Sequence, residues 1–141
     1  MSPSLGIKLV PSLVENSADL ERTIGAFART PNGGLLLPPD IGTTIHRDLI
    51  IALAAQYRLP TVAWSRLFVA AGGLMSYGVD HVDMSRQAAS YVDRILRGDK
   101  PAELPVQQPV KFELVINMKT AKALGLTVPQ SMLLRADEVI Q

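Results

Sequence analysis

The chain has 141 residues, which is enough for one domain with a sizeable hydrophobic core and too few for two such domains. Apolar residues make up 48% of the chain and charged residues 19%, a balance typical of a folded domain. The 14 basic and 13 acidic residues leave a formal net charge of +1 without a basic cluster, so we expect no nucleic-acid partner. The chain has no cysteine, which excludes disulfides, thiolate metal ligands and cysteine nucleophiles. Its longest apolar runs, such as residues 49–55, are far shorter than the roughly 20 residues that span a bilayer.

The first predicted elements are a strand and a helix. Residues Ile7–Leu13 are β-branched in part and are broken by Pro11, which predicts a short strand. Asn16 or Ser17 can then cap a helix. The apolar positions of that helix have helical spacing and are Leu20, Ile24 and Phe27.

A second strand and helix follow. Residues Gly34–Leu37 are all apolar and predict a buried strand. Thr43 or Thr44 can cap the next helix, which ends at Arg58–Pro60. Its apolar stripe consists of Ile45, Leu49, Ala52 and Leu53.

The same order occurs once more. Residues Thr61–Trp64 predict a third strand, and a short helix after Ser65 ends at Gly72 or Gly73. A fourth strand is predicted for Leu74–Tyr77. Alternating strands and helices with short connections predict an α/β fold, a doubly wound parallel, Rossmann-like sheet with helices on both faces.

The character of the chain changes after the next helix. Asp83 can cap this long helix, which stops at Gly98. Repeated prolines predict an extended segment without helix at Ala102–Val110, and alternation predicts a strand near a sheet edge at Lys111–Ile116. The apolar stripe of the long helix consists of Met84, Ala88, Val92, Ile95 and Leu96.

The C-terminal part is predicted to be an extended arm with two short helical pieces. A helix over Met118–Leu124 stops at Gly125. Residues Pro129–Ile140 predict a helical turn and a last extended piece.

Two short motifs match signatures of enzymes or metal sites only in part. His46-Arg47-Asp48-Leu49 resembles a protein-kinase catalytic loop, but position 53 is leucine where that loop needs asparagine. Residues 80–83, Asp-His-Val-Asp, offer too few ligands for a stable metal site and are more typical of a helix cap. We expect no metal and no cofactor.

The glycine-rich segment Gly73–Gly78 is the remaining candidate for catalysis. A nucleophile elbow needs glycine where Leu74 stands, and a phosphate loop should precede a helix instead of following one. We therefore predict that the chain is not an enzyme.

The position of the loops indicates a ligand site instead. In an open parallel sheet, ligands bind beyond the carboxyl ends of the strands. The loops expected there carry aromatic, acidic and hydroxyl side chains that suit a small organic ligand, although capping and core packing are equally good explanations for several of them. The candidate ligand residues are Asp40, Thr43, Thr44, Trp64, Ser65, Ser76 and Tyr77.

Three stretches carry a resemblance to a known family. They read RLPTVAWSRLFVAAGGLMSYG, AASYVDRILRGDKPAELPVQQPVKFELVINMKTAKALGLTVP and LLRADEVI. They resemble the C-terminal half of ABC-transporter substrate-binding proteins of the tryptophan/tyrosine-type family, which are periplasmic binding proteins of a type I-like kind. In such proteins two lobes joined by a hinge close over a ligand and deliver it to a permease.

The resemblance implies a division of the chain into three parts. Residues 1–75 resemble an incomplete second lobe, and residues 76–104 resemble a hinge crossing with a helix that packs on the first lobe. Residues 105–141 resemble the return strand, a short helix and the C-terminal arm. The hinge positions implied in this way are Gly72, Gly73, Gly78 and Pro105.

The resemblance also implies that the first lobe, together with the first strand and helix of the second, is absent. The apolar stripe of the long helix would then be exposed, and an exposed apolar stripe is an association site. We therefore expect a homodimer or swapped oligomer in which a second chain covers this helix.

The resulting hypothesis is a solute-binding component, or a fragment of one, of an ABC importer. Asp40 would bind the ammonium group of an amino-acid ligand, and Thr43 or Thr44 its carboxylate. The expected location is periplasmic or extracytoplasmic, with a lipid anchor as an option for the full-length protein, and the expected partners are permease subunits. The alternatives are the effector domain of a transcription regulator or sensor with the same architecture and a small flavodoxin-like enzyme, which would need a phosphate loop.

Overall fold

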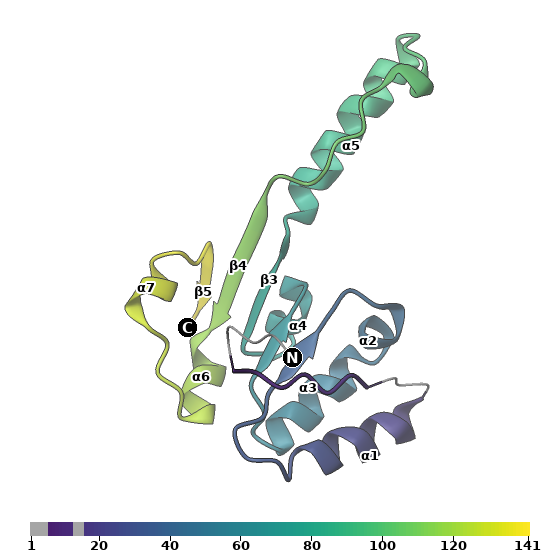
Figure 1. The fold of residues 1–141 in the computed structure, drawn as a ribbon. Coiled ribbons are helices and arrows are strands. Elements are labelled where there is room, and N and C mark those ends of the chain that lie inside the picture. The colour runs from purple at the N-terminus through teal and green to yellow at the C-terminus, as the bar shows by residue number, and fades with distance from the viewer. Residues whose placement is uncertain (1–5, 13–15) are drawn as a thin grey trace.

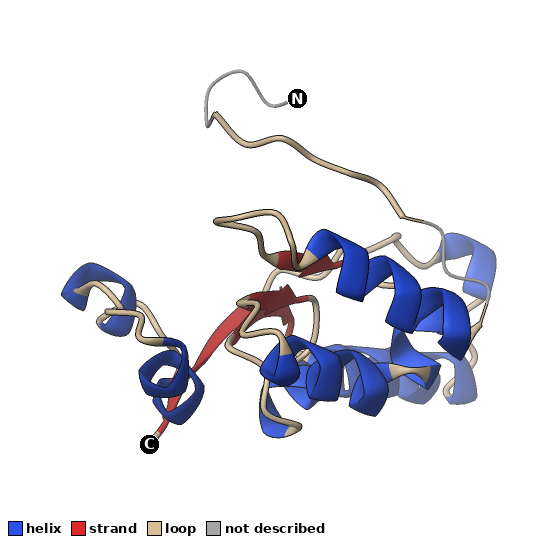
Figure 2. Cartoon of the chain, turned by 90° about the horizontal axis from the view of Figure 1, so that it is seen from below, coloured by secondary structure: helices blue, strands red, loops and turns tan. Residues whose placement is uncertain are grey.

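A five-stranded sheet with the strand order β1-β2-β3-β4-β5 organises the computed structural model, which describes residues 6–12 and 16–141 (Figure 1). The β1–β2, β2–β3 and β4–β5 pairs are parallel and the β3–β4 pair is antiparallel. Figure 2 shows the strands in the middle of the molecule with helices around them. The predicted α/β class with a mostly parallel sheet is confirmed. The strands are β1 (Leu35–Leu37), β2 (Thr61–Ala63), β3 (Met75–Val79), β4 (Phe112–Asn117) and β5 (Glu138–Ile140).

The helices begin and end close to the predicted residues in several places. Asn16 caps α1, because its side chain accepts a hydrogen bond from the backbone N–H of Asp19 at 2.9 Å. Helix α6 ends at Gly125, whose φ of +73° lies in the left-handed region that favours glycine. The helices are α1 (Ser17–Phe27), α2 (Ile41–Ile45), α3 (Arg47–Gln56), α4 (Arg66–Ala70), α5 (His81–Leu96), α6 (Met118–Leu124) and α7 (Gln130–Leu133), with a 3-10 helix at Pro101–Glu103.

The main hydrophobic core lies on one face of the sheet. Side chains of β1 and β2 that point to this face, Leu37 and Ala63, are buried against helices α1, α3 and α4. The buried residues that these helices contribute include Leu20, Ile24, Ile50, Ile51, Leu53, Ala54 and Phe68. Burial of such side chains is the dominant favourable contribution to folding.

The opposite face of β1 to β3 stays open within the described part of the chain. Alternate residues of the three strands, Leu36, Val62 and Tyr77, are 65%, 38% and 62% exposed. The prediction that the first of these strands is buried throughout is therefore wrong at Leu36, because described helices cover β1 from one side.

The strand predicted for Ile7–Leu13 does not form in the described residues. Ile7 makes a single β-bridge, residues 8–12 have no regular secondary structure, and Leu13 lies outside the described residues. The apolar side chains of Ile7, Leu9 and Val10 are exposed. The sheet ends at β1, so this segment does not extend it as a sixth strand.

The start of the second helical region differs from the prediction. Asp40, and not Thr43 or Thr44, caps α2, because its Oδ1 accepts a hydrogen bond from the Thr43 N–H at 3.1 Å. The predicted single helix is also divided, since α2 ends at Ile45 and α3 begins at Arg47. The cap therefore lies immediately before the short helix that it starts.

The long helix α5 also starts earlier than predicted. Asp80, and not Asp83, is its N-cap, because Asp80 Oδ1 accepts hydrogen bonds from the N–H groups of Val82 and Asp83 at 2.9 and 3.0 Å. One carboxylate thus satisfies two of the N–H groups that a helix leaves unpaired at its start.

The C-terminal part is more closely integrated into the sheet than an arm. β4 lies between β3 and the end strand β5, so it is near an edge of the sheet as predicted, and the last extended piece of the chain forms β5 itself. The helical turn and the extended piece themselves are confirmed. The segment predicted to lack helix overlaps the 3-10 helix, in which Pro101 stands at the first turn, where proline is tolerated.

Helix α5 projects away from the sheet, and the return segment lies along it (Figure 1). β3 leads into α5 and β4 leads back, and the two strands are paired from Met75↔Ile116 to Val79↔Phe112. The hydroxyl of Tyr91 donates a hydrogen bond to the carbonyl of Pro105, which ties the return segment to the helix. In the described residues, no helix is long and apolar enough to cross a membrane.

Replacement of Gly78 by alanine is expected to destabilise the fold. A Cβ at this position would lie 1.7 Å from the backbone oxygen of Trp64, so β3 and the end of β2 would have to move apart. We expect the free energy of unfolding of Gly78→Ala to fall by at least about 2 kcal/mol in urea titrations. The matched control is Gly25→Ala in α1, where the added Cβ meets only the Tyr57 side chain, with its hydroxyl at 3.2 Å. This side chain is 38% exposed and can shift, so that a gain of up to about 1 kcal/mol is expected. Equal effects of the two substitutions would contradict this account.

Candidate functional site

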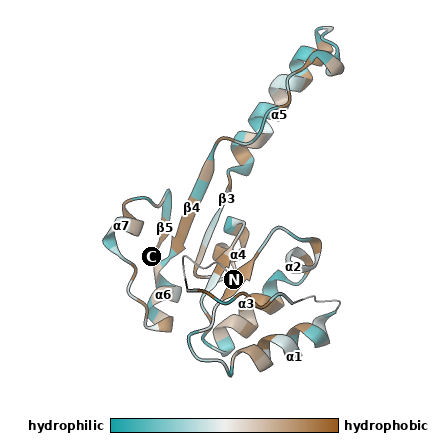
Figure 3. Ribbon diagram, in the orientation of Figure 1, coloured by the Kyte–Doolittle hydropathy of each residue, from teal (hydrophilic) through white to brown (hydrophobic). Residues whose placement is uncertain are grey.

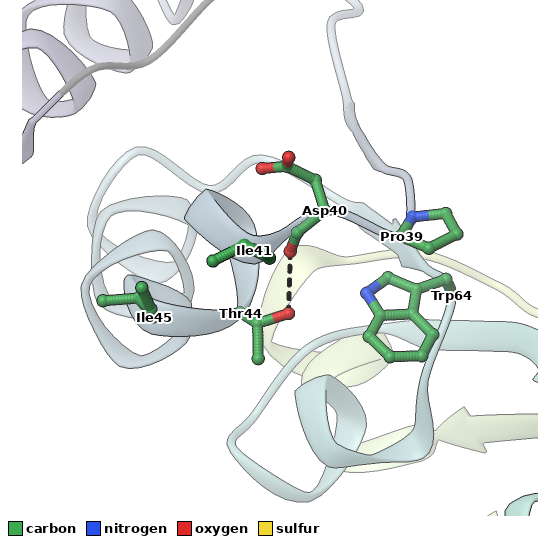
Figure 4. A pocket seen from close by; sticks show the side chains of 6 residues that line it. All are labelled: Pro39, Asp40, Ile41, Thr44, Ile45 and Trp64. Carbon is green, nitrogen blue, oxygen red and sulfur yellow. Dashed lines mark hydrogen bonds between the residues drawn. The ribbon is translucent and has the colours of Figure 1, made fainter.

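An open hollow of about 370 Å³ lies beside the ends of β1 and β2 (Figure 4). It brings together three of the predicted ligand residues, Asp40, Thr44 and Trp64. The other lining residues are apolar and are Pro39, Ile41 and Ile45. The position agrees with the rule that open α/β sheets bind ligands beyond the carboxyl ends of their strands.

The polar groups on the α2 side of the hollow have local partners. Besides the Asp40 cap, the Thr43 hydroxyl donates to the Asp40 carbonyl at 2.9 Å, and the Thr44 hydroxyl donates to the same carbonyl at 2.8 Å. Figure 4 shows the Asp40 carboxylate turned away from Trp64. The capping explanation that the sequence left open therefore describes these three residues in the present geometry.

Trp64 forms the opposite wall. Its backbone N–H donates to the Leu37 carbonyl at 3.2 Å, which holds it beside β1. The indole ring meets the His81 ring edge to face, with centroids 5.6 Å apart and planes at 81°. The indole Nε1 is buried and has no hydrogen-bond partner among the described residues.

The remaining predicted ligand residues do not line this hollow. Ser65 is buried and caps α4, because its Oγ accepts a hydrogen bond from the Leu67 N–H at 3.3 Å. Ser76 is fully buried in β3, and its Oγ has no hydrogen-bond partner in the described part of the chain. Tyr77 lies on the open face of the sheet and stacks on Phe112 with ring centroids 5.7 Å apart.

Sequence reasoning missed the apolar lining of the hollow. Ile41 and Ile45 are 77% and 72% exposed, and Ile45 was assigned to the buried stripe of a longer helix. The break of that helix at His46 moves Ile45 into the short helix α2. The sequence did contain one signal for this lining, because Ile41 directly follows Asp40 in one of the loops expected beyond the strand ends.

An ion pair at the base of α5 was also missed. Lys111 Nζ lies 2.8 Å from Asp80 Oδ2, and the Asp80 N–H donates to the Lys111 carbonyl at 3.0 Å. These contacts join the two strands at the point where they leave the sheet for α5. The hydrogen bond from Lys111, with help from the Asp83 N–H, lowers the pKa of Asp80 to about 2, and Asp80 in turn raises the pKa of Lys111.

Arg66 makes a second link between distant parts of the chain. It lies at the start of α4 and contacts Glu113 of β4 at 3.4 Å and Glu138 of β5. One cation thus contacts two carboxylates, which leaves this cluster with a net negative charge. Across residues 6–12 and 16–141, no group of three or more acidic or histidine side chains is arranged to hold a metal ion.

Removal of the Asp80 charge is expected to change how stability depends on pH. A carboxyl group whose pKa is lowered on folding stabilises the folded state above its unfolded pKa, and this contribution disappears as the pH falls through the folded pKa. The Asp80 contribution should therefore be lost between about pH 4 and about pH 2. Asp80→Asn keeps a residue that can cap a helix but removes the charge.

We expect Asp80→Asn to be less stable than the wild type at pH 6 and to approach it near pH 2, as measured by thermal unfolding across this range. Asp137→Asn, a change in a carboxylate that has no ion pair within the described chain, is the control and should not show the same convergence. A difference between wild type and Asp80→Asn that stays constant with pH would contradict the prediction.

Comparisons with known proteins agree on one family. The family model described as ABC transporter substrate binding protein matches residues 1–140. A curated relative, a tyrosine-binding protein of Clostridioides difficile, is 25% identical over 92 residues, which are 65% of this chain and 27% of the relative. The family is one of substrate-binding proteins, which is consistent with the prediction that the chain is not an enzyme.

Solved structures support the same conclusion. A conserved domain protein of Vibrio cholerae is 31% identical with a TM-score of 0.84, over 96% of this chain and 46% of that one. An ABC domain in complex with L-Trp from Streptococcus pneumonia is 26% identical with a TM-score of 0.78, over 90% of this chain and 44% of that one. A ligand-free, open structure of a substrate-binding protein with adhesive properties from Clostridium difficile, 19% identical with a TM-score of 0.70, shares the fold over 98% of this chain and 46% of that one. The chain thus spans less than half the length of each of these relatives, and it belongs to the ABC transporter substrate binding protein family.

Proposed function

We propose that this chain is part of the solute-binding component of an ABC importer, and that it forms one side of a cleft that captures a small organic ligand. The observation that supports this most directly is the apolar hollow at the strand ends, in a chain of a substrate-binding family. Relatives whose names mention tyrosine or L-Trp make an amino acid a reasonable candidate ligand. As in other extracytoplasmic binding proteins of ABC transporters, the partner would be a permease, and a lipid anchor is one option for the full-length protein.

The proposed ligand roles follow the polar groups around the hollow. Asp40 takes part in no ion pair of the described residues, so its carboxylate is available for a ligand ammonium group if it turns toward Trp64. Thr43 or Thr44 would bind the ligand carboxylate after releasing the Asp40 carbonyl. Ser65, Ser76 and Tyr77 would contribute only with a change in the position of α5 and its two connecting strands.

A hinge at β3 and β4 is the second part of the proposal. Residues 1–75 would form the incomplete second lobe, residues 76–104 the crossing, and residues 105–141 the return. The projection of α5 away from the sheet on two adjacent strands supports this division (Figure 1). Gly72, Gly73, Gly78 and Pro105 are the proposed hinge residues. Gly72 has a φ of +110°, and a Cβ at Gly73 would lie 2.8 Å from the Phe68 carbonyl. The local backbone geometry therefore also favours glycine at both positions, independently of a hinge.

Ligand binding tests the proposed function. Amino acids and small carboxylates should raise the melting temperature of a longer chain that includes the other half of the relatives, because a ligand that binds only the folded state stabilises it by about 2.7 kcal/mol at a hundredfold excess over Kd. The 141-residue chain should respond less, because it supplies one side of the cleft. If no such ligand stabilises the longer chain in a thermal-shift screen, the proposed function is wrong.

We also propose that the isolated chain associates through α5. Figure 3 shows apolar and polar residues interspersed along α5. The apolar side chains of Val92 and Leu96, one helical turn apart, are 55% and 82% exposed. Val106 in the return segment is 98% exposed, and a groove of about 460 Å³ lies between the helix and the return segment. An exposed apolar surface of this kind favours burial against a second copy.

A charge placed on this stripe should prevent the association. We expect the wild-type chain to sediment as a dimer or larger oligomer at micromolar concentration and Val92→Asp to sediment as a monomer. Ser90→Asp adds the same charge on the opposite side of α5 and should leave the association unchanged. A wild-type chain that is monomeric throughout would exclude this proposal.

A further inference from the structure

Trp64, the only tryptophan of the chain, holds a buried hydrogen-bond donor without an acceptor. Its indole Nε1 is covered from solvent and has no partner within the described residues. Buried donors are nearly always paired in folded proteins, because an unpaired donor has lost its bond to water without gaining another. An unpaired donor in the wall of an open hollow therefore calls for an explanation by binding.

The surroundings of the indole restrict what can approach it. Ile41 and Ile45, both largely exposed, form the other wall, and Pro39 lies beside Trp64, so the hollow offers apolar surface (Figure 4). No lysine or arginine is among its lining residues. The one acidic side chain, Asp40, has its carboxylate turned away from Trp64 and bonded to the Thr43 N–H.

Thr44 lies across the hollow from the nitrogen-bearing edge of the indole. Figure 4 shows this edge directed toward Thr44, whose hydroxyl donates to the Asp40 carbonyl at 2.8 Å. Thr44 is exposed, so its side chain can rotate without disturbing the core. Because Nε1 is covered from solvent in this geometry, a ligand oxygen could accept the indole N–H and the threonine O–H together only after neighbouring side chains such as Thr44 have moved.

We propose that Trp64 is a specificity-determining residue whose indole N–H donates a hydrogen bond to an acceptor oxygen of the ligand, while the apolar body of the ligand lies against Ile41 and Ile45. The ligand class is a small molecule with a branched or planar apolar body next to a carboxylate or amide oxygen. This inference rests on the proposed function and makes it more specific. The acceptor oxygen is necessary for binding here, and an ammonium group alone is not sufficient.

Four matched probes separate the acceptor from the ammonium group. L-leucine carries a carboxylate and an ammonium group, 4-methylpentanoate and 4-methylpentanamide carry an acceptor oxygen without an ammonium group, and 3-methylbutylamine carries only the ammonium group. Because the chain has one tryptophan, its ¹⁵N-labelled indole gives one N–H signal that reports directly on this site. We expect the first three probes to move this proton signal downfield, as a new hydrogen bond does, and the amine to leave it unchanged.

Affinities of two variants complete the test. Trp64→Phe keeps an aromatic wall and removes the donor, so it should bind 4-methylpentanoate about three- to tenfold more weakly. Tyr57→Phe, which removes a hydroxyl from an aromatic residue that does not line the hollow, should bind it as the wild type does. The backbone amide spectrum of each variant shows whether it is folded. The indole signal is measured on the wild type, so it tests the inference even if a variant does not fold.

The outcomes distinguish this inference from the function on which it rests. If the probes bind but the indole signal does not move, if the amine moves it as much as the carboxylate, or if Trp64→Phe binds unchanged, the inference is wrong and the proposed function stands. If none of the four probes binds this chain or the longer one, the inference is wrong and the proposed function is weakened with it.

Discussion

Five residue pairs join β3 to β4, and this antiparallel ladder connects every other part of the molecule. On one side of it, β2 and β1 continue the sheet and carry α1, α3 and α4. On the other side, β4 pairs with β5, against which α6 packs. At one end both strands leave together for α5, where the Asp80–Lys111 ion pair holds them. An antiparallel pair is well suited to this role because its hydrogen bonds run straight across between the strands.

The same ladder explains why glycine stands at position 78. The carbonyl of Trp64 comes so close to Gly78 that no side chain fits between them. The loop that carries Trp64 is thereby fixed against β3, and the indole is placed beside α2 and His81. The wall of the proposed ligand site and the strand that leads to α5 are therefore neighbours. A movement of α5 about these strands would change the contacts of the indole, so the hinge closure proposed above would couple α5 to the proposed ligand site.

Local sequence signals were sufficient for much of the fold. The spacing of Leu20 and Ile24, with a cap at Asn16, identified α1, and Gly125 identified the end of α6. Errors arose where two capping residues compete within a few positions, as at Asp40 and Thr43 and again at Asp80 and Asp83. The choice depends on which side-chain oxygen can reach the free N–H groups, and composition does not contain that information.

Tertiary neighbours decided the remaining features. The order of β4 and β5 depends on pairing between residues more than 20 positions apart, which no local pattern contains. The candidate site was found as a set of loops because the carboxyl ends of parallel strands meet at one edge of a sheet. Its apolar lining at Ile41 and Ile45 was missed, because exposed apolar side chains in a short helix look like core residues of a longer one.

The shortness of β1 has a consequence for how the molecule meets others. A sheet edge offers unpaired backbone groups to any passing chain, and long flat edges are common starting points of aggregation. β1 presents only Leu35–Leu37, so a foreign strand could form few backbone hydrogen bonds there. Contacts with other molecules at this edge are thus expected to use side chains instead of backbone pairing. Such contacts can be changed by single substitutions, and they can dissociate without disrupting the sheet.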